Sequence, residues 1–204
     1  GGAHAIAAMA YGTQSIPSCD IIAGPGNRFV TAAKKIVSED VAIDFLAGPS
    51  EVLVLSDGTT SSRLIAAEMI AQAEHAPDAC SILVTSSSKQ AEEVGQELSE
   101  QIENRERREV IGTALEDHGA LLVAQSLPDA IDFSNRYAPE HLVLSVGDPE
   151  GVLTQIQNAG SVFLGEYSPV AIGDYCSGPN SILPTLGLSR RLGGLTANSF
   201  LKTV

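Results

Sequence analysis

The adjacent pair Glu140-His141 carries the clearest signal for chemistry, in the segment Ala-Pro-Glu-His-Leu at 138–142. Pro139 stops the helix expected before it, so both side chains lie on the turn that opens a strand, which we take as a usual place for catalytic groups in α/β folds. A carboxylate beside an imidazole provides two proton acceptors, and partial burial would raise the pKa of Glu140 toward that of His141. The pattern fits acid–base catalysis, and equally a solvated strand edge.

A second candidate site begins at the end of an apolar helical segment, where Gln72 and His75 are three residues apart. This spacing directs an oxygen and an imidazole nitrogen from one helical face to a common point. Such a pair without thiolate suits zinc or a similar divalent ion. The alternative is a histidine that the helix dipole favours. Asp174, within Gly173-Asp174-Tyr175, is either a third oxygen ligand or a turn former.

The turn Gly24-Pro25-Gly26-Asn27 follows a short apolar run and precedes a helical segment. A glycine turn at a helix N-terminus exposes N–H groups that suit a phosphate or another anion. The dinucleotide fingerprint, however, requires a third glycine where Phe29 stands. An anion site and a simple strand-to-helix turn both remain open.

Strands and helices that alternate along the chain must position these groups. The expected strands are 20–22, 51–56, 81–85, 120–124, 141–146 and 161–165. The expected helices are 2–11, 27–37, 61–75, 88–109, 127–137 and 149–158. This alternation predicts an α/β fold with a mostly parallel sheet and flanking helices. Residues 1–47 contain too few strands for an independent sheet, so we expect a partial lobe there and a larger α/β lobe over 48–204.

Composition limits the function classes. The chain has 12 basic and 25 acidic residues, a net charge of −13, which repels nucleic acids and anionic membranes. Its three cysteines form no paired motif, which indicates a reducing compartment. No apolar run is long enough to span a bilayer and no basic secretory leader opens the chain, so we expect a cytoplasmic protein. The absence of an initial methionine indicates processing or a piece of a longer protein.

Taken in order, the motifs AGPGN, AGPSEVLV, QAEH, APEHL, FLGEYSP, GDYCSGPN and LPT resemble histidinol dehydrogenase, from Gly1 to about Lys202. The resemblance implies incomplete Rossmann-like lobes and a zinc-dependent homodimer. It further implies oxidation of L-histidinol to L-histidine through the aldehyde, in two NAD-dependent steps that end histidine biosynthesis. Members of the family are longer at both ends, so the sequence corresponds to their central portion.

The resemblance also implies roles for individual residues. Glu140 and His141 match the acid–base pair; Gln72, His75 and Asp174 match zinc ligands; Ser50 matches a substrate contact and Asn27 an NAD contact. His4 replaces an NAD-contacting glutamine, and Ser181 a histidine expected to contact the substrate. The fourth zinc ligand of the family is a histidine near the C-terminus of the partner subunit, and no histidine follows His141 here.

On this basis residues 1–47 are expected to be part of a nucleotide-binding lobe, and 48–204 to carry the zinc and substrate site. Two alternatives remain open. Because Ser181 removes a ring from the substrate pocket, the chain could belong to a relative that oxidises another small amino alcohol. Because segments of the family are missing, it could also be a non-catalytic domain that retains the fold.

Overall fold

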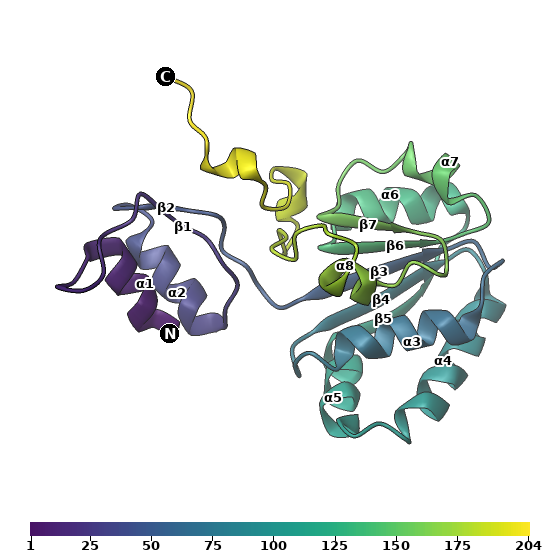
Figure 1. Cartoon of the computed structure of the whole chain (residues 1–204). Coiled ribbons are helices and arrows are strands. Elements are labelled where there is room, and N and C mark those ends of the chain that lie inside the picture. The colour runs from purple at the N-terminus through teal and green to yellow at the C-terminus, as the bar shows by residue number, and fades with distance from the viewer.

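The computed structural model describes all 204 residues, arranged as two units joined by a single stretch of chain (Figure 1). The N-terminal unit consists of α1 (Gly2–Tyr11), β1 (Ile21–Ile22), α2 (Arg28–Val37) and β2 (Ala42–Ile43). Its two short strands pair in parallel, and its small core is built from Ile6, Ile22, Val37 and Val41. The nucleotide-binding role expected for residues 1–47 stays a prediction.

The larger unit is built on a parallel sheet of five strands in the order β5-β4-β3-β6-β7. The strands are β3 (Glu51–Ser56), β4 (Cys80–Thr85), β5 (Gly119–Val123), β6 (His141–Ser145) and β7 (Ser161–Leu164). Every residue of β3 is buried, because helices cover both faces of a doubly wound sheet. The predicted α/β class with a mostly parallel sheet is confirmed. From β3, the next two strands along the chain are added on one side and the last two on the other, so the direction of strand addition reverses between β3 and β6.

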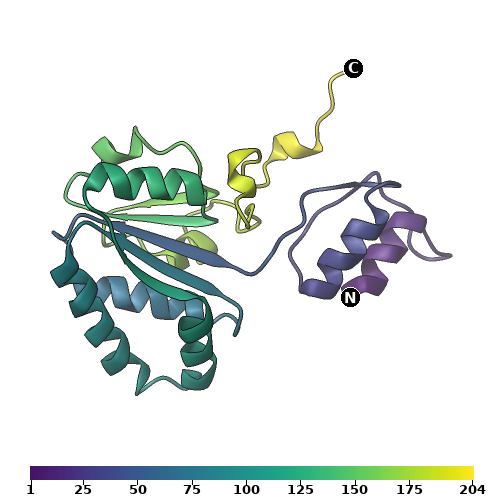
Figure 2. The same ribbon diagram turned by 180° about the vertical axis from the view of Figure 1, so that it is seen from behind.

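Two layers of helices enclose this sheet (Figures 1 and 2). On one face lie α3 (Ser62–Ala73), α4 (Ser88–Ile102) and α5 (Arg108–His118), together with the short α8 (Val170–Tyr175). On the other face lie α6 (Leu127–Tyr137) and α7 (Pro149–Leu153). Alternate residues of each strand therefore feed two separate cores, as the side-chain period of two requires.

The expectation of one helix over 88–109 is wrong, because α4 ends at Ile102 and α5 begins at Arg108. Residues 103–109 contain no apolar side chain that could continue the buried face. The periodicity resumes in α5, where Ile111 and Ala114 are fully buried and pack against α3. The helix expected over 88–109 thus combined one helix, a polar turn and the start of the next helix.

The helix expected over 149–158 is also shorter, since α7 ends at Leu153. Asn135 of α6 explains why. Its amide donates to the carbonyl of Gln155 and its oxygen accepts from the N–H of Gln157, so this backbone is held by a side chain instead of a helical ladder.

Beyond β7, α8 and the short 3₁₀ turns Leu188–Arg190 and Ala197–Phe200 were not anticipated from the sequence. None of the helices combines the length and the apolar content that crossing a lipid bilayer requires.

Candidate active site

A polar cavity of about 280 Å³ opens at the amino ends of β3 and β6. Its walls are made by Ser50, Gln72, His75, Glu140, His141, Asp174, Tyr175 and Ser181. The structure thus brings together seven of the nine candidate residues and leaves out His4 and Asn27. Glu140 and His141 lie, as expected, where a strand begins; only the description of this position as usual is wrong. The ligand site of such a sheet usually lies at the carboxyl ends of the strands, whereas this cavity lies at their amino ends.

Local structure explains how Glu140 and His141 reach this cavity. Helix α6 ends at Tyr137, and buried Ala138 then adopts a left-handed conformation with φ of 58°. Pro139 follows and prevents any continuation of the helix. The chain reverses there and enters β6, where His141 pairs in register with Val52 of β3.

His141 is held in one tautomer. Its Nδ1–H donates to the carbonyl oxygen of Glu51 at 2.9 Å, so its Nε2 carries the lone pair. That Nε2 is buried and has no hydrogen-bond partner. Burial lowers the pKa of His141, and the hydrogen bond to the Glu51 backbone partly opposes this shift. The side chain is therefore a neutral imidazole at neutral pH, with its basic nitrogen free.

Glu140 has the opposite shift. Its side chain is buried, and this burial raises its pKa to about 8. The backbone N–H of Glu51, which donates to Oε2 at 2.7 Å, opposes the shift, while the charges of Glu51 and Asp174 add to it. The Oε2 atom lies 3.6 Å from Nδ1 of His141. A carboxyl group of this kind changes its protonation in the range where many enzymes work.

The candidate metal ligands lie on the helical wall of the cavity. Gln72 lies on the last turn of α3, buried, and its amide nitrogen has no partner. His75 is exposed and lies in the turn after the helix end, with Nδ1 3.2 Å from the carbonyl of Ala71. Asp174, on α8, is exposed at the cavity. No three His, Cys, Asp or Glu side chains in the chain are arranged to hold a metal ion.

The two candidate cofactor contacts lie in the N-terminal unit. His4 is exposed on α1. Asn27 caps α2, and its side-chain oxygen accepts from the N–H groups of Phe29 and Val30. Two of the donors expected to face an anion are therefore already occupied by this cap.

Hydrogen bonds from two buried side chains also hold the glycine turn before Asn27 in place. Lys34 donates to the carbonyl of Gly24 and to the carboxylate of Asp44, the latter at 2.6 Å, and the side chains of both Lys34 and Asp44 are buried. Asp44 in turn accepts from the N–H of Gly24.

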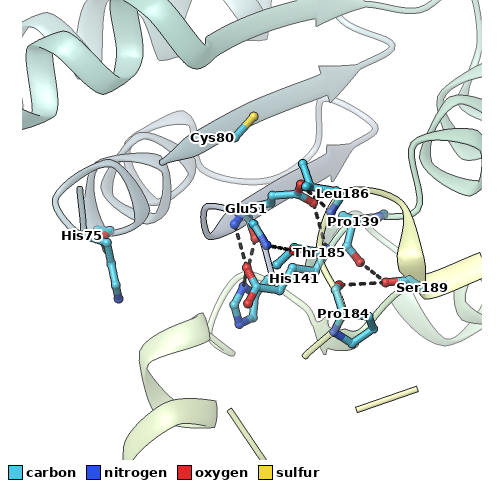
Figure 3. A network of polar contacts seen from close by, with 12 residues as sticks. Glu51, His75, Cys80, Pro139, His141, Pro184, Thr185, Leu186 and Ser189 are labelled. Atoms are coloured by element: carbon cyan, nitrogen blue, oxygen red, sulfur yellow. Dashed lines mark hydrogen bonds and ion pairs between the residues drawn. The ribbon is translucent and has the colours of Figure 1, made fainter. Parts of the chain in front are cut away.

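The sequence patterns did not single out Glu51, which is 5% exposed and whose backbone contacts both members of the candidate pair. Figure 3 shows Glu51 beside His141. Its position offered a signal. Glu51 is the one charged residue in the run Glu-Val-Leu-Val-Leu-Ser, which is otherwise typical of a strand buried on both faces. A carboxylate in such a strand must find hydrogen-bond donors inside the protein.

Comparisons with known proteins agree with one another. A family model described as histidinol dehydrogenase matches residues 1–204. The histidinol dehydrogenase of Methanocaldococcus jannaschii is 53% identical over 204 residues, and that of Lactococcus lactis is 50% identical over 202. The matches cover 100% and 99% of this chain, but only 47% of each relative. The chain thus spans about half the length of the curated relatives it matches.

Solved structures give the same result. The crystal structure of histidinol dehydrogenase from Elizabethkingia anophelis superposes with a TM-score of 0.96 at 42% identity, over 100% of this chain and 47% of that one. A propionaldehyde dehydrogenase from Clostridium phytofermentans, with a TM-score of 0.53 at 17% identity, covers 97% of this chain and 57% of its own and shares the fold alone. The chain belongs to the histidinol dehydrogenase family.

Proposed function

We propose that this chain forms the catalytic core of an enzyme that oxidises L-histidinol to L-histidine through the aldehyde, at the end of histidine biosynthesis. The observation that carries the proposal is the cavity that joins Glu140 and His141 to Gln72, His75 and Asp174. These residues come from separate segments of the chain, and a shared substrate accounts for such convergence.

In the first oxidation, His141 accepts the hydroxyl proton of the alcohol. Its Nε2 is the atom for this role, because the other ring nitrogen is already bonded to the backbone of Glu51. In the second oxidation, Glu140 takes a proton from the water that attacks the aldehyde. A carboxylate with a pKa of about 8 is a stronger base than an ordinary glutamate.

The proposed enzyme uses zinc and NAD as cofactors. Gln72, His75 and Asp174 would hold the metal, and an amide, an imidazole and a carboxylate are donors that zinc accepts. Gln72 would bind the metal through Oε1, and its amide nitrogen has no hydrogen-bond partner that fixes the orientation of the amide. When bound, zinc supplies a charge that holds the amine and imidazole of the substrate, and NAD accepts the hydride.

Four further residues receive a role in the proposal. We assign Asn27 and His4 to the NAD side, and Ser50 and Ser181 to the substrate side of the cavity. The proposal includes a homodimer, as the resemblance to the family implies, in which the second subunit supplies the fourth zinc ligand. Its cysteines are unpaired, which is consistent with a cytoplasmic enzyme.

The test is a turnover assay with NAD on a chimera in which these 204 residues replace the matching region of the Methanocaldococcus jannaschii relative. L-histidinol is compared with L-leucinol and L-phenylalaninol, at equal zinc. Reduction of NAD with L-histidinol, lost in the E140Q/H141N double variant, supports the proposal. A preference for another amino alcohol points to the role of Ser181, and a folded chimera without turnover contradicts the proposal.

A further inference from the structure

The side chain of Glu51 is a buried carboxylate that the proposed reaction does not use. It forms no ion pair, and it does not line the active-site cavity. Its Oε1 accepts from the N–H of Leu186 at 2.9 Å and its Oε2 from the N–H of Glu140 at 3.4 Å. Since burying a carboxylate costs solvation energy, these two backbone donors are what compensate it.

The backbone of the same residue contacts both candidate catalytic groups, and Figure 3 shows the contact to His141. Its N–H donates to the carboxylate of Glu140 at 2.7 Å, and its carbonyl accepts from the imidazole of His141 at 2.9 Å. Any shift at the first residue of β3 is therefore transmitted to both groups.

The turn that Glu51 binds has an unusual backbone. Leu186 and Gly187 both adopt positive φ, at 54° and 72°, a conformation that a leucine enters only when its surroundings impose it. The N–H of Gly48 donates to Thr185 Oγ1 at 2.6 Å, and a Cβ on Gly48 would lie 2.6 Å from the side chain of Leu186. The turn is thus pressed against the segment that leads into β3.

This turn also lies between two segments that contribute residues to the cavity. Upstream in the same loop, Ser181 lines the cavity. Downstream, the hydroxyl of Ser189 contacts the carbonyls of Pro139 and Pro184, and Pro139 directly precedes Glu140. The 181–189 loop therefore closes a ring through Glu51 that includes the proposed bases and one proposed substrate contact.

We propose that Glu51 is a positioning residue, whose carboxylate fixes the Thr185–Gly187 turn to the start of β3 and so holds Glu140, His141 and the Ser181 loop in the reactive arrangement. The inference rests on the proposed function for its kinetic consequences. Glu51 acts through other residues, because its carboxylate lies outside the cavity that would hold the substrate.

Three variants of the chimera test this role. In E51Q the amide keeps the length but presents an NH₂ to one of the two N–H donors, so one bond is lost. In E51L both bonds are lost while the apolar side chain still fills the buried position. D57N is the matched control, since Asp57 joins the other end of β3 to β6 through the N–H of Gly147 at 2.9 Å.

The expected result is a separation of activity from stability. We expect E51L to lower kcat with L-histidinol about tenfold to hundredfold, the range that a misplacement of about 1 Å produces, and to raise KM through the Ser181 loop. E51Q should lie between E51L and the wild type, because one bond survives. D57N should lower Tm by a few degrees and leave kcat within twofold.

Equal kcat in E51L and the wild type would overturn the proposal, as would losses in E51Q and E51L that follow Tm in the same proportion as D57N. A readout independent of turnover is nitrogen NMR of the imidazoles in the 204-residue chain, assigned with H141N. We expect E51L, but not D57N, to populate the second tautomer of His141. If the folded wild-type chimera fails to oxidise L-histidinol, the proposed function fails, and this spectrum still decides the positioning role.

Discussion

The two ends of strands β3 and β6 contain similar polar residues in opposite states. At the carboxyl ends, the buried Gln90 amide accepts from Thr85 Oγ1 at 2.8 Å and donates to the carbonyl of Thr60 at 3.0 Å. At the amino ends, the equally buried Gln72 amide nitrogen has no partner. Buried polar atoms in native proteins are nearly always bonded, so a group left without a partner at a cavity indicates a place for a ligand.

The carboxyl edge is closed by its own side chains. Ser145 Oγ donates to Thr60 Oγ1 at 2.8 Å, and Thr60 Oγ1 donates to the Ser145 carbonyl at 2.9 Å. The carboxylate of Asp57 accepts a hydrogen bond from the N–H of Gly147. Hydrogen bonds within the protein thus link β3 and β6 at the end where doubly wound folds commonly bind nucleotides. In this chain the unpartnered buried atoms of Gln72 and His141 point to the amino ends of the strands, whereas the fold-level rule points to the carboxyl ends.

We expect the largest effect on the reaction rate from replacing His141, whose Nε2 has no hydrogen-bond partner. H141N should slow the alcohol step about 10²–10⁴-fold, the usual contribution of a general base, because asparagine offers no basic nitrogen. The measurement is single-turnover reduction of NAD by L-histidinol in the chimera. The control S145A, at the far end of the same strand, should change this rate less than twofold. Equal losses of rate in H141N and S145A would show that the amino and carboxyl ends of β6 do not differ in their role.

The second prediction separates the two oxidations. E140Q should impair the aldehyde step about 10²-fold and the alcohol step much less, since only the former consumes an activated water. Because the pKa of Glu140 is raised to about 8, the active carboxylate form increases with pH. The wild-type aldehyde rate should therefore rise through pH 8, and the E140Q rate should stay flat. The same pH profile in both would show that Glu140 is not the base.

A smaller effect is expected at the closed edge, and on stability alone. T60V keeps the shape of the side chain but removes both bonds to Ser145. It should lower the free energy of unfolding by about 1–2 kcal/mol, because it leaves buried polar groups without partners. Urea denaturation measures this, and kcat should not change. A loss of activity at unchanged stability would mean that this edge takes part in the reaction.

The smallest expected effect distinguishes the two glutamines. Q72A should weaken zinc binding about tenfold, the lower end of what a lost ligand or its support costs, while Q90A should leave zinc affinity unchanged and reduce stability. Isothermal titration of the 204-residue chain provides the measurement. The wild-type chain itself should bind zinc more weakly than micromolar, since it offers only three ligands. Submicromolar affinity would show that the partner subunit is not needed.

The features of the fold and of the candidate site that could be predicted from the sequence are those set by neighbouring residues. Strand β3 was predicted to the residue, because an apolar run buried on both faces is a local signal. The break between α4 and α5 was not, since no glycine or proline marks it. The motifs supplied the candidate residues, but the unpartnered state of Gln72 and the bonds of Glu51 depend on contacts with segments far away in sequence. Such contacts leave no local pattern to interpret.

The bonds that orient Glu140 and His141 come from the peptide groups of Glu51, which has a consequence for evolvability. Among substitutions at position 51, only proline removes the N–H donor itself. Other side chains keep both peptide groups but lose the carboxylate that we propose holds them in place. Their geometry depends also on the pairing of Val52 with His141. A codon inserted or deleted within β3 or β6 would turn the side chains beyond the change to the opposite face. Changes of length within these two strands should therefore be eliminated more strictly than substitutions at their positions other than Glu51 and His141.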